Sequence, residues 1–205
     1  MANEAIQPNV LPQNPEKATL EGRNKYLGFW FFLGGETVLF ASLFGTYLGL
    51  RNSYDGGPGP QDLFHLDLVF IMTMLLLTSS LTSVFAVINM KKGNFKKMLT
   101  WMWGTVILGL GFLGFEIYEF VVYYDQGLGY TVSAFASSFY TLVGTHGAHV
   151  TFGIAWIITL LIRYRKTGLT LANAPKFNTA VLYWHFIDVV WVFIFTVVYL
   201  LGVGG

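Results

Sequence analysis

Five long runs of apolar residues, separated by short polar stretches, dominate the hydrophobic pattern of this chain. They cover about residues 27–50, 67–90, 98–124, 133–162 and 177–202. A bilayer core of about 30 Å is crossed by roughly 20 residues in helix, whereas a membrane β-strand alternates apolar and polar residues over about ten positions. The continuous runs therefore predict an all-α membrane bundle. We expect a polar tail over residues 1–26 and a five-helix transmembrane domain over residues 27–205.

Positive charges fall almost entirely on one side of such a bundle. Three lie in the tail, four in the second loop and four in the fourth loop, whereas the opposite side holds only Arg51. Because cytoplasmic loops carry the excess of Lys and Arg, we expect a cytoplasmic N-terminus and an outer C-terminus. The second and fourth loops are short, so spans two and three should be neighbours, as should spans four and five. Small residues one turn apart, at Gly45 and Gly49 and at Ser79 and Ser83, weakly indicate close helix contacts.

Composition narrows the range of functions. Only 11% of the residues are charged and 54% are hydrophobic, whereas soluble domains carry about 25% charged residues. A net charge of +1 gives no indication of a nucleic-acid partner. The chain has no cysteine, which excludes disulfides, thiolate catalysis and cysteine-ligated metals.

Seven ionisable residues fall inside the predicted spans, where each costs about 2.5–3.5 kcal/mol on insertion scales. They are Glu36, Glu116, Glu119, His146, His149, His185 and Asp188. Such side chains should face protein or water and find partners. A series of carboxylates and histidines suits a proton relay, and it equally suits a polar seam that joins helices. The residues alone leave both interpretations open.

Spacing adds expectations for the first span and the histidine pair. Glu36 lies about ten residues into the first span, where apolar surroundings favour the neutral form of a carboxyl. It is a candidate for proton handling, and a hydrogen bond to a neighbouring helix is the simpler alternative. His146 and His149 share one helix face. The pair has the spacing of metal ligands, but we favour hydrogen bonds between helices.

The last span and the third span carry the other pairs. His185 and Asp188 also share a face, so the two side chains can support each other, and Asp188 could also accept a hydrogen bond from a histidine of the fourth span. Glu116 and Glu119 would repel each other if both were ionised, so one should be neutral or paired. Because both lie near the outer end of the third span, we expect them to be partly hydrated.

Four segments resemble signatures of subunit III of haem–copper terminal oxidases, and they occur in the family's order. They are GGETVLFASLF at 34–44, GFEIYEF at 114–120, GTHGAHV at 144–150 and YWHFIDVVW at 183–191. Glu36 matches the family's carbodiimide-sensitive carboxylate. Larger members have seven helices, and this chain lacks the first two. It is therefore similar to the five-helix bacterial form, especially that of caa3-type cytochrome c oxidases of Gram-positive bacteria.

The resemblance implies a non-catalytic subunit of a proton-pumping oxidase in the bacterial plasma membrane, which oxidises cytochrome c and reduces O2 to water. It implies direct packing against subunit I, with subunits II and IV as further partners and with membrane lipid, including bound phospholipid. Haem and copper would lie in the partner subunits, with no cofactor or metal on this chain. The chain would stabilise the catalytic subunit, and Glu36 would help proton uptake. The count of four histidines, with His65 beside an outer loop, agrees with this assignment.

Three alternatives stay open at this point. The same subunit could serve a quinol oxidase, because the electron donor is chosen in subunit II. A scaffold would share the partners but give Glu36 no role in proton movement. An independent proton-coupled transporter would also use intramembrane Glu, His and Asp, but such proteins often show internal repeats and broken helices. The chain has no evident repeat and no proline inside the five runs.

Overall fold

A computed structural model describes residues 12, 14, 17–54, 58–59, 61 and 64–204. Within that part of the chain the regular structure is entirely helical, and five helices are long and apolar enough to cross a membrane. Their bounds are α1 Leu20–Leu50, α3 Leu66–Lys91, α4 Phe95–Asp125, α5 Ala134–Tyr164 and α6 Ala174–Ile194, the last continued by the π-helix η2 Phe195–Leu200 and by α7 Leu201–Gly204. The predicted all-α class and the number of spans are confirmed.

Local chemistry explains where several helices begin and end. The side chains of Thr19 and Ser133 accept hydrogen bonds from the backbone N–H groups of Gly22 and Ala136, which caps the N-termini of α1 and α5. Gly93 and Gly127 follow the ends of α3 and α4 with φ of 72° and 93°. Only glycine adopts this left-handed conformation without steric cost, so these positions end both helices.

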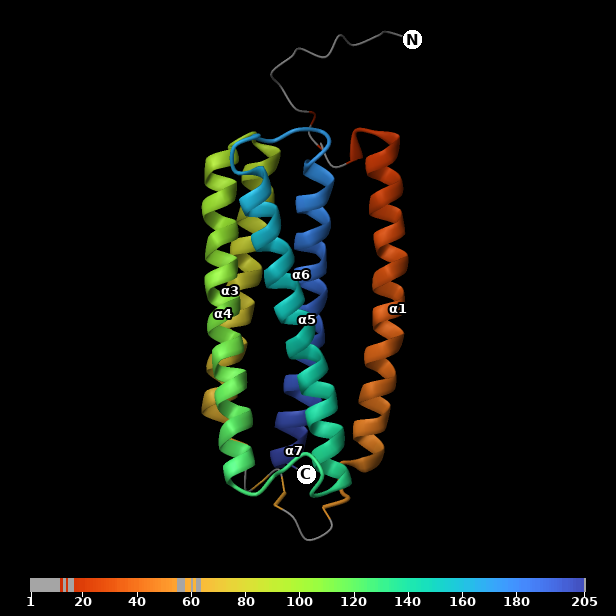
Figure 1. Ribbon diagram of the computed structural model, residues 1–205. Helices are drawn as coiled ribbons and strands as arrows, with labels where there is room; N and C mark the ends of the chain where they lie inside the picture. Colours follow the sequence, from red (N-terminus) through yellow and green to blue (C-terminus); the bar gives the residue numbers. More distant parts are fainter. Residues whose placement is uncertain are drawn as a thin grey trace.

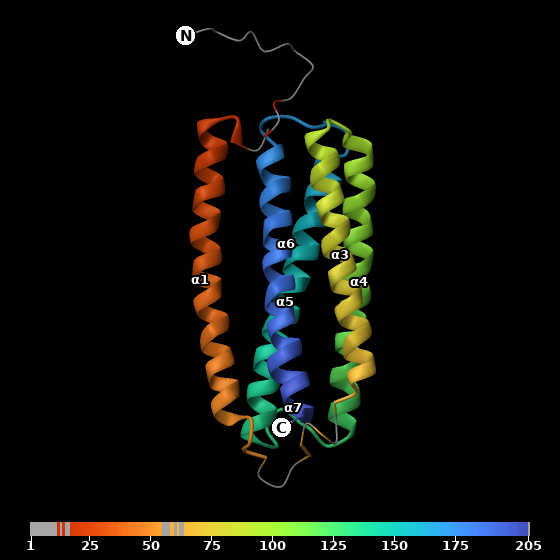
Figure 2. The ribbon, with the colours of Figure 1, turned by 180° about the vertical axis from the view of Figure 1, so that it is seen from behind.

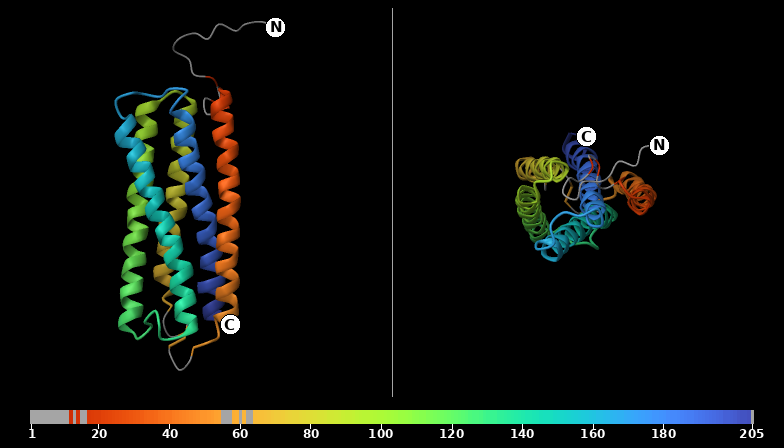
Figure 3. Two further views of the ribbon diagram at one scale, coloured as in Figure 1. Left: turned by 45° about the vertical axis from the view of Figure 1, so that its right-hand side comes forward. Right: turned by 90° about the horizontal axis from the view of Figure 1, so that it is seen from above.

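The helices run side by side along the whole length of the molecule (Figures 1 and 2). Helices α3 and α4 form a tight hairpin, α5 packs on α6, and α1 packs on α5 and α6. Seen from above, α1 stands at one side of the bundle and the α3–α4 pair at the other (Figure 3). The expected pairing of spans two and three, and of spans four and five, is confirmed. The start of α1 and the loops after α3 and α5 lie at the same end (Figure 1).

Tryptophans of α6 fill the centre of the bundle. Trp184 and Trp191 are both buried, and a Cβ added at Gly109 of α4 would lie 2.7 Å from the Trp184 ring. The Trp184 indole N–H donates to Ser79 of α3 at 2.9 Å. Ser79 and Ser83 thus mark a close contact, as expected. Gly45 does not, because a Cβ there would meet open space.

Helix α1 begins earlier than the predicted span. Leu20 to Tyr26 already belong to the helix, so Glu36 lies near the middle of α1 and not in its first third. The remainder of the predicted tail falls mostly on residues 1–11, 13 and 15–16, which lie outside the described residues. Helix α1 also has the fewest buried residues of the five.

Candidate functional site

A carboxyl–imidazole pair joins α1 to α5 halfway along both helices. Glu36 Oε2 lies 3.0 Å from His149 Nε2. The two side chains are 17% and 19% exposed, respectively. The ring of Phe40 stands edge-on to His149 with 5.0 Å between the centroids. The pair is therefore partly shielded but is not sealed inside the bundle.

The contact of the other ring nitrogen of His149, Nδ1, indicates which nitrogen of the neutral ring carries the hydrogen. Nδ1 lies 2.7 Å from the backbone carbonyl of Thr145. A carbonyl only accepts hydrogen bonds, so Nδ1 must carry a hydrogen, and Nε2 of the neutral ring is then an acceptor. A hydrogen bond to Glu36 needs one proton more. Either Glu36 is a neutral acid that donates to Nε2, or an imidazolium donates to its carboxylate. In both states the pair has no net charge, and the two states differ only in which group holds the proton.

The other histidine of α5 is a structural contact. His146 is fully buried, its Nε2 lies 3.3 Å from the Ile187 carbonyl of α6, and its ring packs on Trp191 with 5.2 Å between the centroids. The two histidines of α5 therefore contact different helices, α1 through His149 and α6 through His146. The prediction that they hydrogen-bond between helices is confirmed.

Of the two kinds of partner open to Asp188, the structure places His185 beside it and not a histidine of α5. His149 Nε2 lies against Glu36 and His146 Nε2 against the Ile187 carbonyl, and neither ring hydrogen-bonds to Asp188. The nearest imidazole is that of His185, whose Nδ1 lies 4.0 Å from Asp188 Oδ2. This Nδ1 is also 2.7 Å from the hydroxyl of Ser80 on α3. Asp188 is buried beside these residues at 5% exposure.

The two carboxyls of α4 are more deeply buried than the sequence suggested. Glu116 and Glu119 are 3% and 1% exposed, so the expectation of partial hydration is wrong. Glu119 accepts hydrogen bonds from the hydroxyls of Tyr123 at 2.7 Å and of Tyr199 at 2.8 Å. Glu116 lies against Gly147 of α5, where an added Cβ would be 2.5 Å from Oε2.

Sequence reasoning missed both tyrosine partners. Tyr123 is four residues after Glu119 on the same helix, so the i,i+4 spacing could have revealed it. Tyr199 is 80 residues away on a different helix, and no local pattern points to it. In the part of the chain that the structure describes, no group of three or more His, Asp or Glu side chains is placed to hold a metal ion.

Comparison with known proteins assigns the chain to a family. The family model described as cytochrome c oxidase subunit III matches residues 16–203, nearly the whole chain. The chain belongs to the cytochrome c oxidase subunit III family. It is 72% identical to cytochrome c oxidase subunit 3 of Alkalihalophilus pseudofirmus over 95% of each chain. It is 64% identical to the same subunit of Bacillus sp. strain PS3, over all of this chain and 99% of the relative.

A second group of relatives is more distant. Quinol oxidase subunit 3 of Bacillus spizizenii is 53% identical over 90% of each chain. Membership in this family identifies the chain as subunit III of a haem–copper oxidase. Together with the five helices able to span a membrane, it also identifies the chain as a multi-pass protein of a bacterial membrane. This assignment replaces the alternative interpretation of the chain as an independent proton-coupled transporter. As part of an oxidase complex, the subunit has other oxidase subunits as partners.

Proposed function

We propose that this chain is an accessory, non-catalytic subunit III of a proton-pumping oxidase that uses cytochrome c as electron donor. The observation that carries the choice of donor is the order of identities along nearly the full length. Relatives named cytochrome c oxidase subunit 3 are 72%, 64% and 63% identical, whereas relatives named quinol oxidase subunit 3 are 53% and 52% identical.

An accessory role is supported by what the chain offers to redox chemistry. Electron-entry copper centres use cysteine thiolates and haem irons need axial ligands, yet the chain has no cysteine and four histidines. His146 and His149 are engaged by backbone carbonyls and Glu36. We therefore propose that haem and copper lie in partner subunits, that subunit I packs directly against this chain, and that subunits II and IV complete the complex.

Glu36 is proposed as the carboxyl that assists proton uptake, and the proton shared with His149 supports this role. The shared proton can shift between Glu36 and His149 without changing the net charge of the pair. A proton that leaves the pair would make its net charge −1, so release in one direction must be matched by uptake from the other to avoid a charge in the membrane. The scaffold alternative gives the same pair a structural role only. Glu116, Glu119, His146, His185 and Asp188 are proposed as the polar network that joins α4, α5 and α6 with α3.

The membrane orientation is part of the proposal. The basic residues of the loops after α3 and α5 and of the start of α1 lie at the same end of the bundle. The positive-inside rule then places this end in the cytoplasm. The C-terminus, at the opposite end (Figure 1), would lie outside.

The test is purification from membranes in mild detergent through a tag on this chain. Haem bands in the visible spectrum together with oxidation of ferrocytochrome c are expected. Haem with quinol oxidation alone would move the chain to the quinol branch that the 53% identical relatives represent. A colourless protein that is stable without partners would overturn the accessory role.

A further inference from the structure

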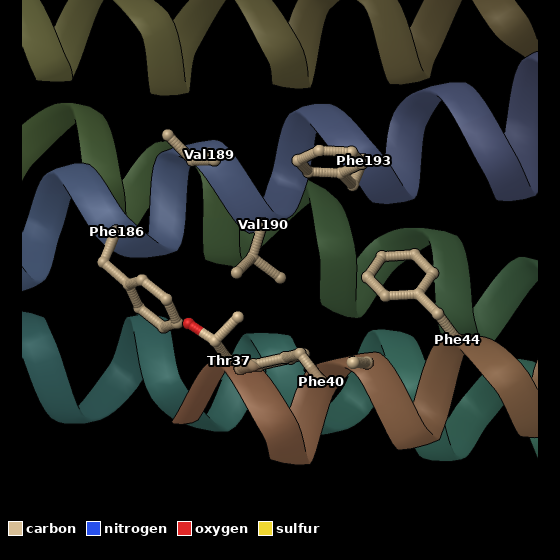
Figure 4. A pocket seen from close by; sticks show the side chains of 8 residues that line it. Thr37, Phe40, Phe44, Phe186, Val189, Val190 and Phe193 are labelled. Carbon is tan, nitrogen blue, oxygen red and sulfur yellow. The ribbon is translucent and has the colours of Figure 1, made fainter. Parts of the chain in front are cut away.

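The hollow between α1 and α6 offers no hydrogen-bond partner to a polar ligand. It has a volume of about 360 Å³ and is lined by phenylalanine, valine and alanine side chains and by Thr37, which face one another across the seam of the two helices (Figure 4). The Thr37 hydroxyl already donates to the Leu33 carbonyl at 2.8 Å. Buried polar atoms that lack partners lie elsewhere, at the contact of α4 with α5.

Glu116 of α4 and His146 of α5 both belong to this contact. The Glu116 carboxyl lies against Gly147, the residue next to His146, where an added Cβ would be 2.5 Å from Oε2 and 2.7 Å from Oε1. The ring of Phe112, one turn before Glu116, stands edge-on to the His146 ring with 5.8 Å between the centroids. The carboxyl and the imidazole are therefore buried beside the same turn of α4, at 3% and 0% exposure.

Each of these two side chains keeps one buried polar atom without a partner. Among the described residues, neither Glu116 Oε1 nor His146 Nδ1 has a hydrogen-bond partner, so the two atoms do not bond to each other either. In folded proteins about 90% or more of buried polar groups are satisfied, by protein or by ordered water. Two exceptions at one helix contact therefore indicate a ligand that bonds to both.

The contacts of His146 show what this ligand must offer to the imidazole. Nε2 lies 3.3 Å from the Ile187 carbonyl, which only accepts hydrogen bonds, so Nε2 carries the ring hydrogen. A charged ring in this fully buried position, with no carboxylate bonded to it, would be costly. The ring is therefore neutral, and Nδ1 is an acceptor that needs a donor.

The contacts of Glu119 show what the ligand must offer to Glu116. Glu119 accepts a hydroxyl hydrogen at each of its two oxygens, from Tyr123 at 2.7 Å and from Tyr199 at 2.8 Å. This is the pattern of a carboxylate, which has no hydrogen of its own. A second carboxylate three residues away on the same helix would repel it. Glu116 is therefore the neutral acid of the two, and its O–H needs an acceptor.

We propose that one water molecule is bound between Glu116 and His146. Water accepts from the acid O–H and donates to Nδ1, so a single molecule satisfies both buried groups. The site carries no net charge, which suits a neutral ligand, whereas a metal ion would require the deprotonated acid.

The bound water gives α5 a second acid–imidazole pair. Glu36 meets His149 directly on the side of α5 that faces α1, whereas Glu116 meets His146 through the water on the side that faces α4. The proposal refines the polar network proposed above, because it states how α4 is joined to α5. It does not depend on the electron donor or on a role of Glu36.

A density map of the purified oxidase complex, at a resolution that shows ordered water, tests the occupant directly. One peak is expected within hydrogen-bonding distance of both Glu116 Oε1 and His146 Nδ1. Glu116→Gln should keep the peak, because the amide still donates a hydrogen to water, and Glu116→Leu should lose it. No peak in the wild-type complex, or a direct hydrogen bond between Glu116 and His146, would overturn the proposal.

Infrared spectroscopy of the same complexes tests the protonation states on which the site depends. Relative to the wild type, Glu116→Gln should remove one C=O stretching band of a protonated carboxyl. Glu119→Gln is the matched control and should leave that band in place. Persistence of the band in Glu116→Gln, or its loss in Glu119→Gln, would contradict the assignment. Both measurements can be interpreted whichever donor the complex oxidises, so they fail or succeed separately from the proposed function.

Discussion

Because the Thr145 carbonyl lies 2.7 Å from Nδ1 of His149, a hydrogen bond between Nε2 and Glu36 needs one proton held by either of the two groups. This arrangement allows two properties of position 36 to be changed separately, namely its hydrogen bond to His149 and its ability to release a proton. A glutamine at position 36 can still donate an amide hydrogen to Nε2, but it cannot release a proton. A leucine can do neither. The two substitutions therefore distinguish a proton-handling carboxyl from a purely structural one.

We expect Glu36→Gln to keep the stability of the detergent-solubilised oxidase within about 0.5 kcal/mol and to lower its turnover. Glu36→Leu should lower turnover and also cost about 0.6–1.7 kcal/mol, the range of interhelical hydrogen bonds in membranes. Thermal inactivation and steady-state oxygen consumption are measured on both. Unchanged turnover and an unchanged rate of inactivation during turnover in Glu36→Gln would favour the scaffold.

Gly147 leaves room for a buried carboxyl of the neighbouring helix. An added Cβ would lie 2.5 Å from Glu116 Oε2, so Gly147→Ala must push α4 and α5 apart or displace the carboxyl. We expect a loss of about 1–3 kcal/mol, typical of an overpacked core, measured by thermal unfolding of the purified complex.

Two matched variants test whether the contact between Gly147 and Glu116 causes the loss of stability. Gly114→Ala on α4 faces open space and should be neutral or slightly stabilising, since alanine favours helix by about 0.5–1 kcal/mol over glycine. Glu116→Ala should restore most of the stability lost by Gly147→Ala. Equal losses from both glycine substitutions would mean that helix packing in general, and not Glu116, sets the cost.

Sequence reasoning found the chemistry-bearing residues but not their partners. Their cost in lipid made all seven ionisable residues visible in the apolar runs. The partner of each depends on helix rotation and depth. Glu36 meets His149 across 113 positions of sequence, and Asp188 lies next to His185 and not next to a histidine of α5. Such contacts are set by the packing of whole helices, which no local spacing encodes.

Among the elements, the end of α6 departs from regular α-helix. Residues Phe195–Leu200 form a π-helix, in which the wider turn moves the residues that follow to new angular positions. Val198 and Tyr199 are consecutive and both fully buried, and Tyr199 reaches Glu119 of α4. The π segment thus connects the last helix to the carboxyl pair of α4.

We expect Tyr199→Phe to destabilise the subunit by about 1–3 kcal/mol, because it leaves an oxygen of a buried carboxyl without a partner. Tyr118→Phe on α4 is the control, since Tyr118 is 59% exposed and should change stability by less than about 0.5 kcal/mol. Thermal unfolding of the two variants is compared. A Tyr199→Phe subunit as stable as the control would show that the hydrogen bond contributes nothing measurable.

The elements themselves were predictable, and their irregularities were not. Apolar runs mark the helices to within a few residues at most ends because lipid imposes a minimum length. The clearest difference is at α1, which begins at Leu20 because a capped helix extends past the membrane wherever its residues allow it. The π segment leaves no mark in the sequence: FTVVYL reads as an ordinary apolar stretch.

At the scale of the whole molecule, charge separates the two ends of the bundle. Eleven of the 12 Lys and Arg residues lie at one end, in or beside the loops after α3 and α5 and around the start of α1. The positive-inside rule predicts the orientation of the whole bundle from this distribution of charge.

The absence of native cysteine makes this orientation directly measurable, since any introduced cysteine is unique. Lys92→Cys and Lys166→Cys place a thiol at the basic end, and Gln126→Cys and Tyr130→Cys place one at the opposite end; all four positions are exposed. Because basic loops stay in the cytoplasm, a membrane-impermeant maleimide should label only Gln126→Cys and Tyr130→Cys in intact cells. In inside-out vesicles it should label only Lys92→Cys and Lys166→Cys. The reverse pattern would invert the topology, while labelling of one basic-end position from each side would contradict the five-span bundle itself.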